Sequence, residues 1–437
     1  MADQARKLAA ECLLRCEAGG YSNLVLRQAL AKSELPRRDR AFCTALVLGT
    51  LSRIRLLDLV LQPYLKKDIS KLDAEVRVLL RMGAYQLKYM NSVPKHAAVN
   101  EAVQLCRAFK KSSAAGMVNA VLRRAADTEQ QPLLDKIKNP TKRLAVACSV
   151  DDSLAEAFVQ LYAGDAEKHL MSFYEPAAVF ARCNSLKTDC AALYAALRDE
   201  NISAGDTALA GCIRLTGGFS GGCAPLADGR MRIQSLPAQL AAAAVGAKRG
   251  ETVLDLCSAP GGKTLCLAQD MCNDGSITAC ELHEHRMALV LKQAELEGVS
   301  IINGICTDAA QFDTQQRYDR VLCDVPCSGY GEIASKPELR YRAPFFSEDL
   351  PALQYAILEN GARLLKQGGT LVYSTCTLLP QENEQITARF LAEHPEFQLQ
   401  QFDNCGYGSW LREGELRFDP CDFLNEGFYI ACFRKVW

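Results

Sequence analysis

The sequence predicts an α/β protein whose C-terminal part is built on a parallel sheet, preceded by an all-helical region and a small α+β region. Apolar residues recur at spacings of three and four through the first 140 or so residues, with no strand alternation. From about residue 246, short apolar strands alternate with helices, as in a parallel sheet covered on both faces. Residues 1–150 contain 26 Lys and Arg against 13 Asp and Glu, whereas residues 151–437 contain 24 against 38. The sequence therefore predicts domains at 1–140, 141–245 and 246–437.

The expected elements follow from these patterns. Breaks at Gly19-Gly20, Pro36, Pro63 and Pro94 divide the helical region into short helices with tight connections. In the middle region we expect helices at 150–162 and 190–198 and strands at 179–184 and 212–215. In the last region we expect strands at 252–256, 276–280, 301–305, 320–323 and 370–374, and helices including 284–297 and 351–365.

Composition excludes several classes of protein. The chain has 20 cysteines but no Cys-x-x-Cys pair and only five histidines, which argues against a structural metal site. We find no secretion leader and no apolar run of roughly 20 residues, so we expect no membrane span and a reducing cytoplasmic location. Most cysteines are then small buried apolar residues. The positive excess of the first 150 residues favours a polyanion such as nucleic acid, although a solvated helical surface would have the same composition.

Residues 254–264 read Leu-Asp-Leu-Cys-Ser-Ala-Pro-Gly-Gly-Lys-Thr, a strand that runs through a tight turn into a helix. Small residues there let the backbone approach a ligand, and the helix start presents free N–H groups to it. A phosphate-binding P-loop would require glycine at position 257, where the chain has Cys257. The Gly-x-Gly-x-x-Gly dinucleotide motif is absent as well, so the segment predicts another kind of nucleotide-cofactor loop.

Two acidic residues follow later strands of the expected sheet. Glu281 ends the second strand, where a carboxylate is placed to accept hydrogen bonds from ribose hydroxyls. Asp308 follows the third strand and is placed to read an adenine amino group. Neither position is specific alone, because surface carboxylates occur at such places too.

Two cysteines lie at the ends of the fourth and fifth strands. Residues 324–329 read Asp-Val-Pro-Cys-Ser-Gly, and residues 373–377 read Tyr-Ser-Thr-Cys-Thr. Neighbouring strand ends would bring Asp324, Cys327 and Cys376 to one crevice. Methylation of a pyrimidine at C5 needs a thiolate that adds to C6, a group on the N3/N4 edge of the base, and extrusion of that base from folded RNA. The three side chains supply the thiols and the polar group, but chemistry alone does not decide which thiol is the nucleophile.

These motifs resemble the RsmB/Sun-type family of bacterial 16S ribosomal RNA cytosine-5 methyltransferases. The resemblance rests on residues 256–264, 324–329 and 373–376, followed by Glu382-Asn383. Residues 94–103 and 119–123 resemble a NusB-type RNA-binding fold, and residues 182–188 resemble the middle domain of the family. Departures occur at Gln234-Ser235, where the family usually has Gln-Asp, and at Ala334-Ser335, where it is often basic. They put details of RNA targeting in doubt.

The resemblance implies a Rossmann-like methyltransferase domain, S-adenosylmethionine as cofactor and 16S ribosomal RNA as partner, in a protein expected to be a monomer. It implies that Cys376 is the nucleophile, that Cys327 assists product release, and that Asp324 and Lys263 complete the catalytic set. The implied cofactor-binding residues are Cys257, Ser258, Ala259, Pro260, Gly261, Gly262, Lys263, Glu281, Asp308 and Asp324.

Alternative functions remain open at this point. A transfer RNA cytosine-5 methyltransferase would carry the same catalytic motifs, and only the resemblance of the helical region favours ribosomal RNA. A non-catalytic RNA-binding factor built on that region would be expected to have eroded cofactor and thiol motifs, but here they are complete. A nucleotide hydrolase is disfavoured by Cys257.

Overall fold

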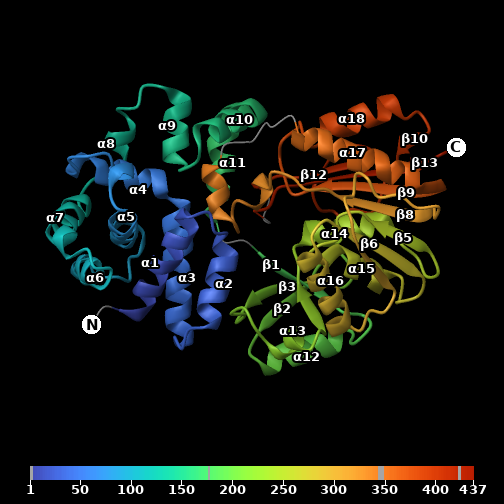
Figure 1. The fold of residues 1–437 in the computed structure, drawn as a ribbon, viewed down its shortest axis with the longest axis horizontal. Coiled ribbons are helices and arrows are strands. Elements are labelled where there is room, and N and C mark those ends of the chain that lie inside the picture. Colours follow the sequence, from blue (N-terminus) through green and yellow to red (C-terminus); the bar gives the residue numbers. More distant parts are fainter. Residues whose placement is uncertain (1–2, 176–177, 343–348, 422–424) are drawn as a thin grey trace. The chain divides into compact units, whose positions relative to one another are not determined.

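The computed structural model describes residues 3–175, 178–342, 349–421 and 425–437 (Figure 1). By its contacts the chain divides into two units. Unit 1 comprises Met1–Glu175 with Ile333–Pro344, and unit 2 comprises Pro176–Glu332 with Phe345–Trp437. The domain boundaries expected at residues 140 and 245 stay predictions.

Unit 1 is helical throughout its described residues, as its apolar spacing predicts. Its helices begin where the sequence signals indicate: Asp3 accepts a hydrogen bond from the N–H of Arg6, and Pro36 and Pro94 directly precede α3 and α6. The helices are α1 (Gln4–Glu17), α2 (Ser22–Ala31), α3 (Arg37–Ser52), α4 (Ile54–Leu61), α5 (Ala74–Tyr89), α6 (Lys95–Ala108), α7 (Ala115–Ala125), α8 (Gln131–Leu134), α9 (Pro140–Ala147), α10 (Asp152–Tyr162) and α11 (Ala166–Ser172). Short 3₁₀ turns connect several of them, including η1 (Gln62–Tyr64).

The core of unit 1 forms around α5, whose apolar face is fully buried. Leu79, Leu80 and Met82 are all inaccessible to solvent. Helix α3 approaches α5 so closely that a Cβ atom on Gly49 would lie 2.0 Å from the Tyr85 ring. A side chain at position 49 would require the Tyr85 ring to move.

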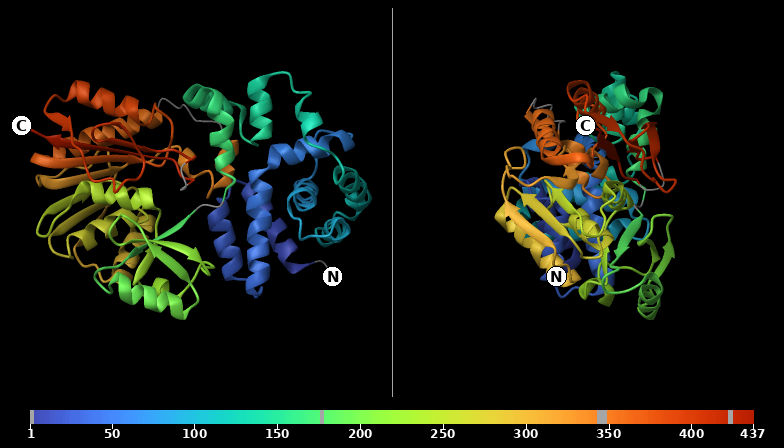
Figure 2. Two further views of the ribbon diagram at one scale, coloured as in Figure 1. Left: turned by 180° about the vertical axis from the view of Figure 1, so that it is seen from behind. Right: turned by 90° about the vertical axis from the view of Figure 1, so that its right-hand side faces the viewer.

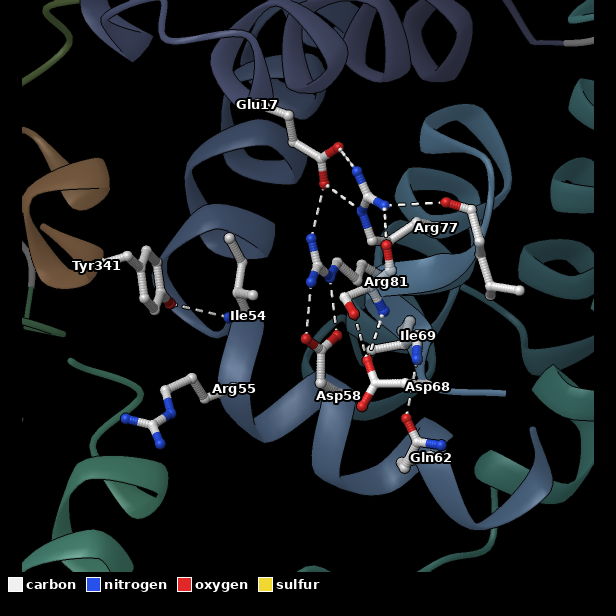
Figure 3. Close-up of polar contacts among 12 residues, drawn as sticks. Glu17, Ile54, Arg55, Asp58, Gln62, Asp68, Ile69, Arg77, Arg81 and Tyr341 are labelled. Carbon is white, nitrogen blue, oxygen red and sulfur yellow. Dashed lines mark hydrogen bonds and ion pairs between the residues drawn. The ribbon is translucent and has the colours of Figure 1, made fainter. Parts of the chain in front are cut away.

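Several arginines of unit 1 are engaged in internal ion pairs (Figure 3). Glu17 binds both Arg77 and Arg81 at 2.7 Å, and the guanidinium of Arg81 also binds Asp58 at 2.7 Å. Arg55 donates to the backbone carbonyl of Val150. Part of the positive excess of the first 150 residues is therefore internal, and only the remaining exposed cations are available to a polyanion.

A short segment from later in the chain, η6 (Pro337–Tyr341), belongs to unit 1. Glu338 accepts hydrogen bonds from the N–H and hydroxyl of Ser22 at the start of α2. The hydroxyl of Tyr341 accepts one from the N–H of Ile54 at the start of α4 (Figure 3). Arg340 is completely buried and donates to the carbonyl of Cys148. The segment thus satisfies helix-end groups that would otherwise lack partners.

Unit 2 contains a small antiparallel sheet and a large mixed sheet. The small sheet has the order β2-β3-β1-β4. Its apolar residues share one core with residues of two helices, α12 and α13, which lie between its strands in the chain. Its elements are β1 (Val179–Cys183), β2 (Ser203–Asp206), β3 (Cys212–Gly217), β4 (Met231–Ile233), α12 (Cys190–Asp199) and α13 (Ala224–Ala227). The sequence analysis predicts β1, β3 and α12 but misses β2 and β4, which are only four and three residues long.

The large sheet has the order β11-β12-β13-β9-β8-β5-β6-β7, with β10 paired to β13. The five expected strands are all present, as β5 (Thr252–Asp255), β6 (Ser276–Glu281), β7 (Ile302–Cys306), β8 (Tyr318–Asp324) and β9 (Leu365–Thr375). The helices are α14 (Leu236–Val245), α15 (Gly262–Asp270), α16 (Glu284–Glu297), α17 (Asp349–Leu364) and α18 (Glu384–Glu393). The C-terminal strands are β10 (Phe397–Leu399), β11 (Ser409–Arg412), β12 (Glu415–Phe418) and β13 (Phe428–Lys435).

The expected parallel sheet is present, and it continues as antiparallel strands on its C-terminal side. Strands β5 to β9 pair in parallel, but β13 runs antiparallel to β9 and β12 runs antiparallel to β13. Short connections account for the two outer pairs: two residues, 413–414, join β11 to β12 and nine residues, 419–427, join β12 to β13, whereas a parallel crossover needs a dozen or more. Gly414 has a φ of +80°, which such a tight turn requires.

Helices cover both faces of the parallel strands, as expected. Val253, Leu322 and Val372 face a core that includes α14 and α15. The adjacent Leu254, Val321 and Leu371 face the opposite core, with α17 and α18. This alternation follows from the two-residue repeat of a strand. Figure 2 shows the same strands and helices from two further directions.

Candidate active site

The polar residues predicted from sequence lie at the carboxyl ends of neighbouring parallel strands. Asp255 ends β5, Glu281 ends β6 and Asp324 ends β8. Strands β8 and β9 pair directly, with Asp324 opposite Ser374. The expected adjacency of the fourth and fifth strands is confirmed. In parallel sheets this edge is where ligands bind.

The predicted cofactor loop occupies residues 257–261, between β5 and α15 (Figure 1). The N–H and the hydroxyl of Ser258 both donate to the carbonyl of Cys280 on β6. Gly261 has a φ of +107°, a conformation that favours glycine, and its N–H donates to the carbonyl of Ser258. Helix α15 begins at Gly262. The start of α15 therefore lies beside a turn whose backbone is fixed by hydrogen bonds to β6 and within the loop itself.

Asp255, at the end of β5, holds the loop in place through two hydrogen bonds. Its carboxylate accepts hydrogen bonds from the Thr264 hydroxyl at 2.7 Å and from the N–H of Cys257 at 3.3 Å. Complete burial raises the pKa of Asp255 to about 7, against the effect of the hydrogen bond from Thr264. Asp255 thus ties both ends of the loop together.

Lys263 and Asp324 form the central ion pair of the site. The Lys263 ammonium lies 2.7 Å from one carboxylate oxygen of Asp324, and the Ser374 hydroxyl donates to the other at 2.7 Å. Burial alone would lower the pKa of Lys263, but the Asp324 carboxylate outweighs it and the pKa is raised. Lys263 is therefore a fixed positive charge and not a base.

Of the two carboxylates predicted to hold the adenosine part of a cofactor, Glu281 ends β6 and Asp308 lies two residues after the end of β7. Among the described residues, Glu281 accepts through one oxygen, from the N–H of His283 and from Arg286, both at 3.1 Å. Asp308 accepts from the N–H of Ala310 and from the Gln311 side chain. Carboxylate oxygens can accept further hydrogen bonds. Their roles toward a cofactor stay predictions.

The two predicted thiols lie in contact. The sulfur atoms of Cys327 and Cys376 are 3.2 Å apart, and both cysteines are free and half-buried. The hydrogen bond with Cys327, followed by burial, raises the pKa of Cys376 well above its ordinary value. In the free protein at neutral pH, Cys376 is therefore a thiol and needs a proton acceptor before it can act as a nucleophile.

Glu382 and Asn383, which follow the second thiol motif, hold the loops that carry the two cysteines. Glu382 accepts from the N–H of Ser328, next to Cys327, and from the Gln354 side chain. Asn383 accepts from the Thr375 hydroxyl and donates to the carbonyl of Thr377, on either side of Cys376. These residues position the thiols without touching either sulfur atom.

Two residues at this site are absent from the sequence prediction. Glu332 accepts a hydrogen bond from the Cys376 thiol at 3.3 Å. Burial raises the pKa of Glu426 to about 7, and the nearby Glu332 charge contributes to the rise. Neither belongs to a recognised motif, and the distance in sequence between Glu332 and Cys376 hides their contact. One sequence signal pointed to Glu426: it lies just before β13, and β13 pairs with β9, the strand that leads to Cys376.

The described residues contain neither a metal-binding cluster nor a membrane-spanning helix. Within 3–175, 178–342, 349–421 and 425–437, no group of three or more His, Cys, Asp or Glu side chains has the arrangement of a metal site. Across the same ranges, no helix combines the length and apolar character needed to cross a bilayer.

Comparison with known proteins is consistent over the whole chain. A family model described as 16S rRNA methyltransferase RsmB/F matches residues 242–434, and a NusB family model matches residues 3–127. A Bacillus subtilis protein named as a probable ribosomal RNA small subunit methyltransferase B is 35% identical, with 98% of each chain covered. The ribosomal RNA small subunit methyltransferase B of Thermus thermophilus is 33% identical, covering 99% of this chain and 98% of its own.

A solved structure adds the fold. A methyltransferase homologue from Pyrococcus horikoshii superposes with a TM-score of 0.61 at 26% identity, covering 68% of this chain and all of its own. The parallel strands, the loop into α15 and the polar strand ends thus define a Rossmann-like methyltransferase preceded by a NusB-like helical region. The chain belongs to the RsmB/F family of 16S rRNA methyltransferases.

Proposed function

We propose that this methyltransferase uses S-adenosylmethionine to methylate C5 of a cytosine in 16S ribosomal RNA through a covalent bond between Cys376 and C6. The contact between the Cys327 and Cys376 sulfur atoms, beside the Lys263–Asp324 ion pair, carries the proposal. A single thiol would suffice for adduct formation, and a second one in contact with it suits the later release of the product.

The residues divide the work by their chemistry. S-adenosylmethionine supplies an electrophilic methyl group when bound, and the loop at 257–263 with Glu281 and Asp308 would hold it. Asp324, which binds the Lys263 ammonium at 2.7 Å, faces the polar N3/N4 edge of the base and stabilises the adduct. Addition of the Cys376 thiolate to C6 makes C5 nucleophilic. After methyl transfer the C5 proton passes to a base, the C5–H electron pair re-forms the C5=C6 bond, and the C6–S bond breaks with its electrons returning to Cys376. Cys327 assists this elimination.

A trapping experiment tests the proposal. Cys327→Ala protein is incubated with S-adenosylmethionine and unmodified 16S transcript and then run on a denaturing gel. We expect a protein–RNA band that disappears in the Cys327→Ala/Cys376→Ala double variant, because release is blocked while addition is not. Cys272→Ala, which removes an exposed cysteine elsewhere, is the matched control and should leave no adduct.

Other outcomes of this experiment would contradict parts of the proposal. A band with Cys376→Ala but not with Cys327→Ala would reverse the roles of the two thiols. A band formed only with a transfer RNA pool would move the activity to that substrate.

We propose further that unit 1 contacts the RNA backbone through an exposed basic edge formed by Lys66, Lys67, Arg123 and Arg124. The Tyr64 hydroxyl lies 2.7 Å from the Thr128 hydroxyl, which brings the η1 turn and the end of α7 together. The Arg124 guanidinium lies 6.0 Å from the centre of the Tyr64 ring, and Arg123 and Arg124 lie in the last turn of α7. The four cations therefore belong to two segments that are in contact.

Replacing all four residues of the basic edge with alanine is expected to weaken RNA binding at low salt. Each lost phosphate contact should make the plot of log affinity against log salt shallower by roughly 0.7 to 0.9. Filter binding at several salt concentrations measures this slope. Lys248→Ala, an exposed lysine of unit 2, is the single-charge control. An unchanged slope in the quadruple variant would place the phosphate contacts elsewhere.

A further inference from the structure

The raised pKa of Cys376 leaves a gap in the proposed reaction, because something must accept the thiol proton. We propose that Glu332 is a catalytic residue that accepts the proton of the Cys376 thiol as its sulfur attacks the RNA base. The inference rests on the proposed function, since it requires Cys376 to be the nucleophile. The Glu332 carboxylate is 3.3 Å from the reacting sulfur atom.

The backbone holds Glu332 firmly against the thiol. It ends the short η5 turn (Tyr330–Glu332), and its N–H donates to the carbonyl of Gly329. The preceding residue, Gly331, donates its N–H to the carbonyl of Cys376 itself at 2.9 Å. Gly331 also packs against Gly427, and a Cβ atom there would collide with the Gly427 carbonyl. A direct backbone link to Cys376 thus fixes the position from which Glu332 reaches the sulfur.

The other charged groups around Cys376 are less suited to accept its proton. Both oxygens of Asp324 are engaged, one by the Lys263 ammonium and one by the Ser374 hydroxyl. Lys263 is held in its charged form, and Cys327 is a second thiol. Glu426 also faces this group, since the Glu332 charge raises its pKa, but its hydrogen bond goes to Ser235. Among the described residues, Glu332 is the carboxylate with a direct contact to the Cys376 sulfur.

The step is balanced without any added reagent. The S–H bond breaks, its electron pair stays on sulfur and forms the bond to C6, and the proton passes to a carboxylate oxygen of Glu332. At the same time the C5=C6 π bond of the base opens, and its electron pair moves toward C5 and the N3 edge of the ring. A carboxylate is a weaker base than a thiolate, so the proton moves as the C–S bond forms and not before it. When Cys376 is later eliminated as a thiolate, the proton returns from Glu332 to sulfur. The proton that leaves C5 is a separate one.

Glu332→Gln distinguishes a catalytic role from a structural one, because we expect it to lower the rate of methyl transfer while making Cys376 easier to alkylate. General-base catalysis contributes typically 10²- to 10⁴-fold, so we expect single-turnover methyl transfer at pH 7 to fall by about 100-fold or more. The remaining rate should rise by about tenfold per pH unit, because hydroxide then replaces the carboxylate. Alkylation of Cys376 by iodoacetamide in the free protein should begin at lower pH than in the wild type, because a like charge that opposes the thiolate is gone.

The controls make the inference separable from the proposed function. Glu332→Asp should restore part of the rate, and the exposed Glu413→Gln should match the wild type in both assays. A wild-type rate and pH profile in Glu332→Gln would overturn the inference, and so would a parallel loss of methyl transfer and of Cys376 alkylation. Full turnover by Cys376→Ala would instead refute the nucleophile assignment itself.

Discussion

Cys376→Ala is expected to abolish methyl transfer, with a loss of at least about 10⁴-fold in single-turnover rate. In the proposed mechanism the Cys376 sulfur forms the covalent bond, so its loss removes the reaction path itself, and other groups of the site do not replace a missing nucleophile. The loop at 257–261 is held by Ser258, Cys280 and Asp255 and not by Cys376. Affinity for S-adenosylmethionine, measured by calorimetry, should therefore change by no more than about twofold, because no binding contact of the loop is lost.

The comparison needs a control for the general effect of losing a cysteine. Cys272→Ala is expected to transfer methyl groups at the wild-type rate, because Cys272 is exposed and lies after α15, away from the strand ends. Retained turnover in Cys376→Ala would show that the neighbouring Cys327 or another group forms the adduct.

Asp324→Asn is expected to reduce methyl transfer by about 10³-fold and to destabilise unit 2 by about 3 kcal/mol. The substitution leaves the Lys263 ammonium buried without its carboxylate partner, which lies at 2.7 Å in the intact site. It also removes the negative charge that, in the proposed mechanism, faces the base. Single-turnover rates measure the first effect, and urea unfolding measures the second.

A second ion pair on the same strand provides a matched control. Asp319, near the start of β8, lies 2.9 Å from Lys366, and both side chains are more exposed than Lys263. Asp319→Asn should cost less than about 1 kcal/mol and leave the rate unchanged. Lys263→Met/Asp324→Asn should regain most of the stability but none of the activity. Equal activity losses at Asp319 and Asp324 would contradict a specific role for Asp324.

The sequence alone predicted much of the fold because its signals are local. Each parallel strand is a short apolar run next to a helix, and α16 occupies the predicted range 284–297. The predicted cofactor loop and both thiol motifs are contiguous segments, and the residue types in each segment indicate the chemistry that it could perform. Strand order in a parallel sheet then predicted the adjacency of β8 and β9, which brings Cys327 and Cys376 into contact.

The pairing of the C-terminal strands could not be predicted from local sequence signals. Nothing in residues 397–435 states that β13 will turn back along β9, because pairing direction depends on connection length and on the edge left open by the other strands. The inclusion of Pro337–Tyr341 in unit 1 was likewise unpredicted. That segment follows the first thiol motif in sequence, yet its partners are the distant ends of α2 and α4.

The sequence by itself thus determined the class of the protein, its helical and α/β regions, and the predicted loop and thiols of its site. Only the tertiary structure decided which charges are internal, as for Arg81, and which groups surround the thiol, as for Glu332 and Glu426. The physical reason is the separation in sequence over which each kind of information acts. A motif encodes backbone shape and side-chain chemistry over about ten residues, whereas a proton acceptor is defined by a distance of 3.3 Å between atoms 44 residues apart.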